Sequence, residues 1–348
     1  MKRAKKIISI IVSTIIIVTA FSACSKKVES TPVKIDDFRT TAYIVANNLR
    51  DKENLDTSHF DQITDFILFG CAKFDEDGNV ILDEDFDDIL ETLESGIEEK
   101  ENKKIYLNIL GPDAQIETDD WNKLMQDKAD RHNKAFESGK LEENIKNVLD
   151  EYDFDGIFFD YEYAIKNKNW KIYSNFILSL DKVLGDKYEI GMALSGWDSK
   201  LSKDAKAVVD RIEIMSYDLW DKDGTHASYK IAQDDIKKFE KAGFDKAKLD
   251  LGVPFYARPT TQDAVWYDYK EYVDKIDEKG FAEDVERGLT ASFNTYDDIA
   301  KKTELAIDSG LGGMMIWHYA CDVPQSNEKS LFNAIENTVN ERASEQNK

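Results

Sequence analysis

The sequence DGIFFDYEY, residues 155–163, is the strongest indication of how this chain folds. An apolar run typical of a buried strand ends here in two carboxylates, Asp160 and Glu162. Because side chains alternate along a strand, both acids and Phe158 are expected on one face, with about 7 Å between the Cα atoms of the acids. A chain with 69 acidic residues also produces such pairs by chance. The rest of the sequence has to decide between a catalytic pair and a chance pairing.

Further apolar runs on both sides of this stretch have the character of strands. Together with residues 155–163 they make eight: TAYIVAN (41–47), DFILFGCA (65–72), KIYLNIL (104–110), YEIGMAL (188–194), RIEIMSYD (211–218), LDLGVPFY (249–256) and GGMMIWHY (312–319) are the other seven. Amphipathic segments lie between them, with apolar residues at steps of three and four, as in residues 85–100, 141–152, 170–185 and 297–310. Gly185 and Gly310 close two of these predicted helices.

Strands that are apolar on both faces and alternate with helices predict a parallel sheet covered by helices. Eight such units predict an α/β fold of the (β/α)8 TIM-barrel type, in a single catalytic domain without a large insertion subdomain. A doubly wound open sheet is the competing architecture, but no phosphate-binding glycine loop follows the first strand. Residues 259–311 have room for two helices and little else, which predicts a shallow and open groove.

Polar and aromatic residues follow several of the predicted strands. In a barrel, functional side chains gather at the carboxyl ends of the strands. Those ends carry Asp160 and Glu162, Tyr217 and Asp218, Tyr256 and Arg258, and Trp317 and His318. Aromatic rings offer flat faces to sugars and carboxylates bind sugar hydroxyls, so the rim predicts a carbohydrate site. Two close carboxylates do not both ionise easily, so one of the acid pair is expected to keep a proton for general acid catalysis.

The first 23 residues have the pattern of a signal peptide, with a basic start, an apolar stretch and small residues before Cys24. The apolar stretch is too short and wrongly flanked for a membrane-spanning helix. FSAC (residues 21–24) resembles the lipobox of bacterial lipoproteins, which predicts lipidation of Cys24; a secretory peptide cleaved nearby is the alternative. We expect export and lipid anchoring to the outer face of the bacterial cytoplasmic membrane. The expected layout is a polar tether (24–39), a folded domain (40–335) and a polar tail (336–348).

The net charge of −23 becomes −27 when removal of residues 1–23 takes away four basic side chains. Such a chain repels phosphate backbones, so nucleic acid is excluded as a partner, whereas neutral sugars are compatible. Cys71 and Cys321 lie in apolar contexts and are expected as buried hydrophobic residues. The histidines show no metal-ligand spacing, so no metal and no cofactor is expected. We also expect a monomer.

Residues 155–163 resemble the signature DGxDxDxEY of glycoside hydrolase family 18, which contains chitinases and endo-β-N-acetylglucosaminidases. Other stretches are similar to family motifs and follow in the family's order between about residues 40 and 322: DEDGNV (75–80), MSYD (215–218), LGVPFYAR (251–258) and YDDIAKKTELAIDSGLGGMMIW (296–317). Several motifs in the right order are more specific than any one of them. The catalytic interpretation of Asp160 and Glu162 is therefore preferred.

The resemblance implies a retaining, substrate-assisted hydrolysis of glycans that contain N-acetylglucosamine. In it Glu162 protonates the glycosidic oxygen, the acetamido carbonyl of the substrate attacks the anomeric carbon, and Asp160 holds the acetamido N–H. Tyr217 would bind the acetamido carbonyl oxygen and Trp317 would form the floor of the site. Four further residues are expected to contact the substrate: Tyr43, Asp218, Tyr256 and Arg258. The expected substrates are β-1,4-linked chitin oligomers, N-glycan cores or peptidoglycan; the alternative is a surface sugar-binding protein on the same barrel that has lost turnover.

Three positions depart from the family pattern. Phe158 stands where the signature has its middle Asp, Cys71 stands about where the family often has Phe, and NILGP (108–112) replaces SxGG. None of them removes Glu162 or Asp160. We expect an apolar barrel layer around Phe158 and, because Phe forms no hydrogen bond, an Asp160 side chain turned toward Glu162.

Overall fold

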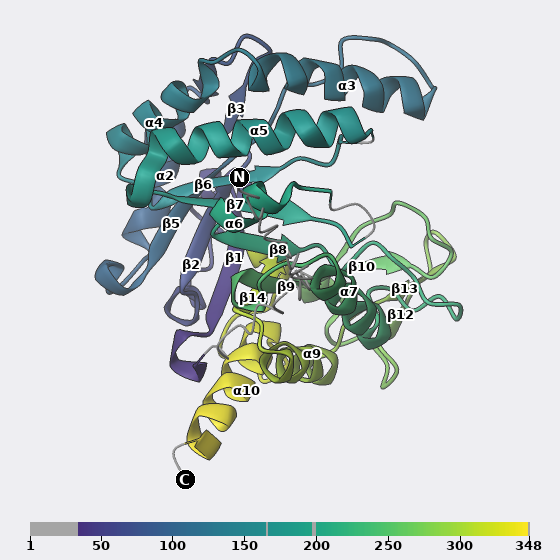
Figure 1. The fold of residues 1–348 in the computed structure, drawn as a ribbon. Helices are drawn as coiled ribbons and strands as arrows, with labels where there is room; N and C mark the ends of the chain where they lie inside the picture. Colours follow the sequence, from purple (N-terminus) through teal and green to yellow (C-terminus); the bar gives the residue numbers. More distant parts are fainter. Residues whose placement is uncertain (1–33, 165, 197–199, 347–348) are drawn as a thin grey trace, which may run out of the picture.

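The computed structural model describes residues 34–164, 166–196 and 200–346. Within these residues, eight parallel strands close into a barrel in the spatial order β1, β2, β5, β6, β7, β8, β9, β14 (Figure 1). They are β1 (Arg39–Val45), β2 (Asp65–Phe69), β5 (Lys104–Ile109), β6 (Gly156–Asp160), β7 (Glu189–Leu194), β8 (Arg211–Ile214), β9 (Leu249–Pro254) and β14 (Gly313–Trp317). Each overlaps one of the eight predicted runs, so the predicted (β/α)8 barrel is confirmed. The predicted signal peptide and Cys24 lie outside the described residues.

Helices connect the strands and cover the outside of the barrel (Figure 1). They are α1 (Ala46–Arg50), α2 (Phe86–Ser95), α3 (Trp121–Phe136), α4 (Leu141–Tyr152), α5 (Asn167–Leu184), α6 (Lys203–Val208), α7 (Tyr229–Lys241), α8 (Tyr269–Tyr272), α9 (Tyr296–Ser309) and α10 (Leu331–Gln346). The side chains of Asp120, Ser202 and Thr295 accept backbone hydrogen bonds in the first turns of α3, α6 and α9. Gly185 and Gly310 follow α5 and α9 as predicted, and Gly310 adopts the left-handed conformation (φ 73°) that suits glycine at a helix end.

The connection between β9 and α9 contains a small antiparallel sheet, so the expectation of two helices and little else is wrong. Its strands pair in the order β11, β10, β13, β12. Their bounds are β10 (Tyr256–Pro259), β11 (Tyr267–Asp268), β12 (Phe281–Asp284) and β13 (Leu289–Ser292). Strands this short do not show the sustained alternation that identifies a strand in a sequence. The insert lies to one side of the barrel (Figure 1), and a second hairpin, β3 (Ala72–Phe74) with β4 (Val80–Leu82), follows β2.

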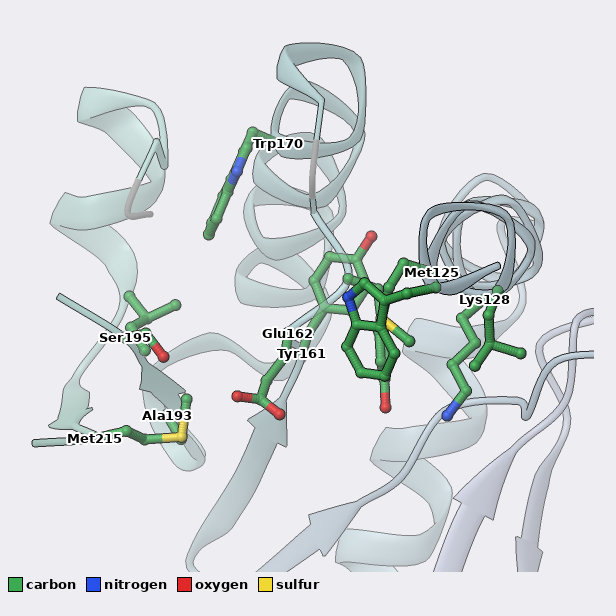
Figure 2. A pocket seen from close by; sticks show the side chains of 12 residues that line it. Met125, Lys128, Tyr161, Glu162, Trp170, Ala193, Ser195 and Met215 are labelled. Carbon is green, nitrogen blue, oxygen red and sulfur yellow. The ribbon is translucent and has the colours of Figure 1, made fainter. Parts of the chain in front are cut away.

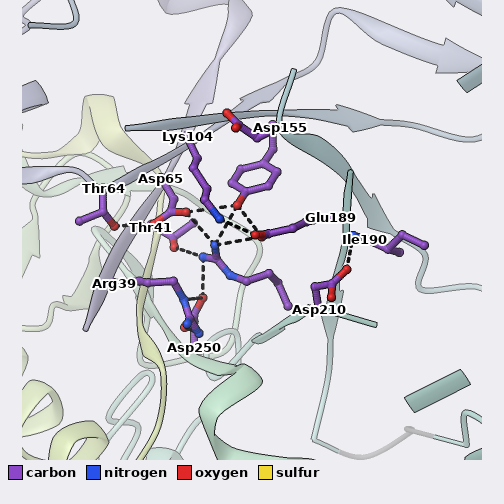
Figure 3. Close-up of polar contacts among 12 residues, drawn as sticks. Arg39, Thr41, Thr64, Asp65, Lys104, Asp155, Glu189, Ile190, Asp210 and Asp250 are labelled. Carbon is purple, nitrogen blue, oxygen red and sulfur yellow. Dashed lines mark hydrogen bonds and ion pairs between the residues drawn. The ribbon is translucent and has the colours of Figure 1, made fainter. Parts of the chain in front are cut away.

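Layers of inward-facing side chains fill the barrel. At the amino-terminal end of the strands, the buried Arg211 donates to Asp65 Oδ1 (2.7 Å) and to Asp250 Oδ2 (3.0 Å) (Figure 3). Nearer the carboxyl ends lies a mostly apolar layer, which consists of Tyr43, Ile67, Tyr106, Phe158 and Met315. The apolar surroundings predicted for Phe158 are confirmed.

Phe158 occupies space that Gly191 leaves open on the neighbouring strand. β6 and β7 pair these two residues directly, and a Cβ atom added to Gly191 would lie 2.3 Å from Cζ of Phe158. The Phe158 ring also meets Tyr106 edge-on, with 5.0 Å between the ring centroids. The ring is therefore part of a fitted layer.

The carboxyl-terminal boundary differs from the expected one. Residues 336–346, expected as a polar tail, continue α10, in which Thr338 is buried. Asp322 fixes the start of this helix, because its carboxylate accepts hydrogen bonds from the backbone N–H groups of Leu331 (3.1 Å) and Phe332 (2.9 Å). The expected domain end at residue 335 thus falls inside a helix whose inner face covers the core.

The amino-terminal boundary also lies earlier than expected. Ile35 and Phe38 are buried in the hydrophobic core, so residues 35–39 belong to the folded domain and not to the tether. Among the residues that the structure describes, no helix is long and apolar enough to cross a membrane.

Candidate active site

Asp160 and Glu162 lie at the carboxyl end of β6, on the rim where the other barrel strands also end. Asp160 is the last residue of β6 and is partly buried. Its Oδ1 atom is shielded from solvent and has no hydrogen-bond partner. Glu162 follows two residues later, is exposed, and points its carboxyl group into a pocket (Figure 2). The structure thus brings the two predicted acids together, with Asp160 below and Glu162 toward solvent.

Burial and neighbouring charges favour protonation of these two acids. Burial raises the pKa of Asp160 well above its ordinary value, and the negative charge of Glu162 raises it further. Although Glu162 is exposed as a residue, its carboxyl group lies in the pocket, and its partial removal from water raises its pKa. The charge of Asp218 raises this pKa further, while Lys128 opposes the rise. Two interacting carboxyl groups titrate as a pair. Near neutral pH the pair is expected to hold one proton, which a general acid requires.

A pocket of about 450 Å³ opens beside Glu162 (Figure 2). One wall comes from the ends of β6, β7 and β8, with Glu162, Ser195 and Met215. The other wall includes Trp121 and Lys128 of α3. The indole of Trp121 is 68% exposed, so a flat apolar ring lies next to the acid. Such a ring offers a stacking surface for a sugar.

Trp317 is the last residue of β14 and is held by other aromatic rings. Its ring meets Tyr43 and Phe69 edge-on, with 5.1 Å and 4.9 Å between centroids. Tyr43 is 2% exposed, and its hydroxyl group has no hydrogen-bond partner. Tyr43 therefore lies below the surface of the site, and its expected contact with the substrate stays a prediction.

Three of the other predicted contacts form one hydrogen-bonded group. Asp218 accepts from Tyr256 Oη (2.8 Å) and from Arg258 Nε (2.9 Å) and Nη2 (3.1 Å). Although burial opposes ionisation, the hydrogen bonds from His226, Arg258 and Tyr256 hold the pKa of Asp218 well below its ordinary value. Tyr256 is 2% exposed and stacks on Trp266 at 3.6 Å between centroids. Asp218 is therefore a fixed negative charge near Glu162.

Tyr217 precedes Asp218 and is partly exposed. Its ring lies 6.3 Å from that of Tyr256. Burial raises its pKa well above the ordinary value, with further rises from Tyr256 and from Asp160. The hydroxyl group of Tyr217 consequently keeps its proton and is able to donate a hydrogen bond beside the acid pair.

The cysteines and metal-ligating residues do not form a second reactive centre among the described residues. Cys71 and Cys321 are buried, as predicted, and both are free. Burial raises the pKa of the Cys71 thiol to about 12 and that of Cys321 well above its ordinary value, so neither is a nucleophile. Over the same residues no group of three or more His, Cys, Asp or Glu side chains is arranged to hold a metal ion.

Two features of the site were missed from the sequence. The first is the pocket wall with Trp121 and Lys128, which lies on α3; the connection between β5 and β6 holds two helices, and its unusual length was a usable signal. The second is Glu213 of β8, which is fully buried. It alternates with Ile212 and Ile214, a pattern typical of a strand with one face in solvent, so no local signal marked it.

Known sequences and structures resemble this chain. The sequence profile described as Glycosyl hydrolases family 18 matches residues 39–322, a range that spans all eight barrel strands. No curated protein sequence matches the chain.

Three solved structures show how widely the fold is shared. The GH18 chitinase ChiB from the chitin utilization locus of Flavobacterium johnsoniae aligns with a TM-score of 0.68 and 22% identity, over 88% of this chain and 94% of that one. A chitinase from Bacteroides thetaiotaomicron aligns with a TM-score of 0.66 and 21% identity, over 87% and 96% of the two chains. A mutant class V chitinase from Nicotiana tobaccum in complex with NAG4 aligns with a TM-score of 0.67 and 15% identity, over 87% and 99%. At these identities the likeness establishes a common fold.

Proposed function

The chain belongs to glycosyl hydrolases family 18 and is a glycoside hydrolase; we propose that it hydrolyses β-1,4 linkages of glycans that contain N-acetylglucosamine, by a retaining mechanism in which the substrate supplies the nucleophile. The observation that carries this proposal is the pair of Asp160 and Glu162, whose raised pKa values favour one shared proton near neutral pH. Glu162 is the exposed member and faces the pocket. It is therefore the member that delivers the proton.

In the first step Glu162 donates its proton to the glycosidic oxygen while the bond from that oxygen to the anomeric carbon breaks. The acetamido carbonyl oxygen of the same sugar bonds to that carbon and forms an oxazolinium-like intermediate. Asp160, as a carboxylate, accepts the acetamido N–H and stabilises the developing positive charge. Tyr217 donates to the acetamido carbonyl oxygen and aligns it, and Trp317 supports the sugar ring from below.

In the second step Glu162, now a carboxylate, accepts a proton from a water molecule. The water oxygen bonds to the anomeric carbon, and the bond from that carbon to the acetamido oxygen breaks. Each step inverts the anomeric configuration, so the product retains that of the substrate. Glu162 regains its proton and is ready for another turnover.

Asp218 is the other carboxylate near Glu162, and its contacts argue against a role as nucleophile. It is bound by both the hydroxyl group of Tyr256 and the guanidinium group of Arg258. Charge-assisted hydrogen bonds of this kind stabilise a carboxylate strongly and lower its nucleophilicity. The acetamido group of the substrate is the better candidate.

Chitin oligomers are the substrates we expect first. The solved structures with the same fold include proteins described as chitinases, and the exposed Trp121 offers a stacking surface beside Glu162. N-glycan cores and peptidoglycan contain the same sugar and fall within the proposal.

We also propose that the protein acts outside the cytoplasmic membrane, held there by lipid on Cys24. The support is the sequence of residues 1–24. One acyl chain binds a membrane only marginally, but the several chains of a lipoprotein anchor firmly. Cys24→Ser should release the protein or block its processing, and an unchanged membrane fraction would contradict lipidation.

Initial rates on a fluorogenic chitobioside, a high-mannose glycopeptide and peptidoglycan test the activity and separate the substrates. We expect turnover of the chitobioside, early appearance of the β-anomer by NMR, and inhibition by a thiazoline that mimics the oxazolinium. Inversion of configuration would rule out participation of the acetamido group. Absence of turnover on all three substrates would contradict the proposed substrate class.

A further inference from the structure

A buried glutamate lies inside the barrel below the acid pair. Glu213 belongs to β8, is 0% exposed, and has no hydrogen-bond partner for either carboxyl oxygen. A buried, unpaired carboxylate is among the most costly groups a protein can hold, and such a group keeps its proton instead. Burial accordingly raises the pKa of Glu213 well above its ordinary value. Glu213 is therefore a neutral carboxylic acid.

The strand register places Glu213 close to Asp160. Asp160 of β6 pairs with Ala193 of β7, and Ala193 pairs with Glu213 of β8. All three residues therefore face the inside of the barrel at one level, and two strand spacings separate the acids, or about 10 Å between Cα atoms. Ala193, the residue between the two acids, has only a methyl side chain.

Tyr43 of β1 lies near both acids. After burial, the charges that raise the pKa of Tyr43 most are those of Glu213 and Asp160, in that order. Neither its hydroxyl group nor Asp160 Oδ1 has a hydrogen-bond partner, as is also the case for both oxygens of Glu213. A phenol donates and accepts, a protonated acid donates, and an ionised acid accepts. The three unpaired groups are complementary.

We propose that Glu213 is a positioning residue for the reaction: as a neutral acid it donates a hydrogen bond to Tyr43, whose hydroxyl group donates in turn to the carboxylate of Asp160. The proposal rests on the proposed function, because it assigns Asp160 a carboxylate form in the working enzyme. The consequence is that Asp160 is stabilised as a carboxylate and held in place from below, while Glu162 keeps the proton that catalysis uses.

The other charged groups around Glu213 leave it neutral. Arg211 lies on the same strand, but its charge is shared between Asp65 and Asp250, at 2.7 Å and 3.0 Å. Asp250 of β9 and Asp160 of β6 add negative charge that disfavours ionisation of Glu213. Tyr217 also faces the cluster and stays protonated because burial raises its pKa.

The test compares Glu213→Gln and Glu213→Leu in pH profiles of kcat/KM. The amide of Gln is neutral and still donates, so Glu213→Gln should keep kcat/KM within about threefold and leave both limbs of the profile in place. Leu donates nothing, so Glu213→Leu should lose about 10- to 100-fold in kcat/KM. Its acid limb should move to higher pH, because Asp160 loses the donor that favours its ionised form.

Two results would overturn the proposal. A Glu213→Gln profile with both limbs at lower pH would mean that a negative charge was removed, so that Glu213 was ionised. A Glu213→Leu variant with the rate and limbs of the wild type would mean that no hydrogen bond reaches Asp160. Glu142→Gln is the matched control, since Glu142 of α4 is also buried with an unpaired Oε2 atom; this variant should leave rate and profile unchanged.

Tyr43→Phe tests the relay and does not depend on the folding of Glu213→Leu. Its loss of kcat/KM should resemble that of Glu213→Leu, and the double variant should be no slower than either single variant. Losses that multiply in the double variant would show two independent contributions and contradict the relay.

Infrared difference spectra between the wild type and Glu213→Gln give a readout without turnover. We expect a protonated carboxyl C=O band at neutral pH that the variant lacks; a carboxylate band in its place would overturn the proposal. If the wild type turned over none of the substrates, the proposed function would fail, while the spectra would still decide the protonation of Glu213.

Discussion

The two ends of the barrel interior both bury charged or polar groups, but only one end pairs them. At the amino-terminal end Arg211 binds Asp65 and Asp250, and Asp250 also accepts from Arg39 Nη2 at 2.6 Å (Figure 3). Apart from Nε, the guanidinium nitrogens of Arg211 have partners, as do the carboxylates of Asp65 and Asp250.

Inside the carboxyl end of the barrel several buried polar atoms have no hydrogen-bond partner. They include the hydroxyl oxygen of Tyr43, Oδ1 of Asp160 and both carboxyl oxygens of Glu213. Paired buried charges hold neighbouring strands together, whereas unpaired ones lower stability but remain free to bind a ligand or a proton. The stability of the fold therefore depends on the amino-terminal end of the barrel, and the chemistry depends on the carboxyl end. Substitutions at the two ends should therefore separate loss of stability from loss of activity.

The largest effect on activity is expected at the carboxyl end of the barrel, from Glu162→Gln. The amide fills the same space but has no acidic proton, so the rate should fall by about a thousandfold or more. The melting temperature and the affinity for oligosaccharide, measured by calorimetry, should stay close to those of the wild type. A variant with near-normal initial rates would remove Glu162 from the role of general acid.

At the amino-terminal end of the barrel, Arg211→Met should destabilise the protein strongly, because it leaves Asp65 and Asp250 as buried charges without their shared partner. Removal of one partner from a buried pair costs about 3–5 kcal/mol, which urea unfolding would measure. Arg50→Met is the matched control: Arg50 also pairs with two aspartates, Asp83 (2.6 Å) and Asp85 (2.7 Å), but on the surface. Its cost should stay below about 1 kcal/mol; equal losses in the two variants would refute the contrast between buried and exposed pairs.

Between the two ends, Phe158→Asp should cost about 1–3 kcal/mol, because a carboxyl group becomes buried in a mostly apolar layer and part of the ring volume becomes empty. We expect a lower melting temperature and no gain in turnover. Phe158→Leu separates the two causes, since it opens space without adding a polar group. A Phe158→Asp variant as stable as the wild type and several-fold faster would show that the aromatic layer is not adapted to Phe158.

The smallest effect is a difference in the pH dependence of stability. Burial raises the pKa of Asp160 to about 7, so the native protein binds more protons than the unfolded chain between pH 3.8 and about 7. Over that range this group lowers stability as pH rises. For Asp65, burial opposes ionisation, but the charge of Arg211 and the hydrogen bonds from Thr64 and Arg211 together outweigh it and lower the pKa. The stabilisation by Asp65 is therefore present above pH 3.8 and lost as pH falls.

Asp160→Asn should consequently be more stable than the wild type by about 1 kcal/mol at neutral pH, although it loses activity. The gain should shrink as the pH falls toward 4 in a series of urea titrations. A variant less stable than the wild type at neutral pH would contradict a net cost of burying the charge of Asp160.

Much of this arrangement followed from the sequence, because the fold leaves periodic signals. The eight strands coincide with runs that are rich in apolar residues, and the acids at 160 and 162 lie at the end of one of these runs. The barrel then brings the strand ends together whatever the loops do. Fold and rim residues were predictable for this reason.

The sequence did not predict the burial of residues that are enclosed only when the whole barrel closes. Arg211 and Glu213 alternate with isoleucines, a pattern typical of a strand with one solvent-exposed face. Both side chains nevertheless lie in the closed interior of the barrel. The sheet formed by β10 to β13 was missed because its strands have only two to four residues. The exposure of Trp121 beside Glu162 depends on where α3 lies, which no local pattern states.

The contact between Phe158 and Gly191 has a consequence for the order in which mutations are accepted. With Phe158 in place, a methyl group at position 191 would collide with the ring, since its carbon atom would lie only 2.3 Å from Cζ of Phe158. Once position 158 carries a short side chain, the same methyl group fills the space that the ring has left. The two positions are therefore epistatic, and a lineage that gives up the aromatic residue has to change position 158 before position 191, through an intermediate that carries a cavity.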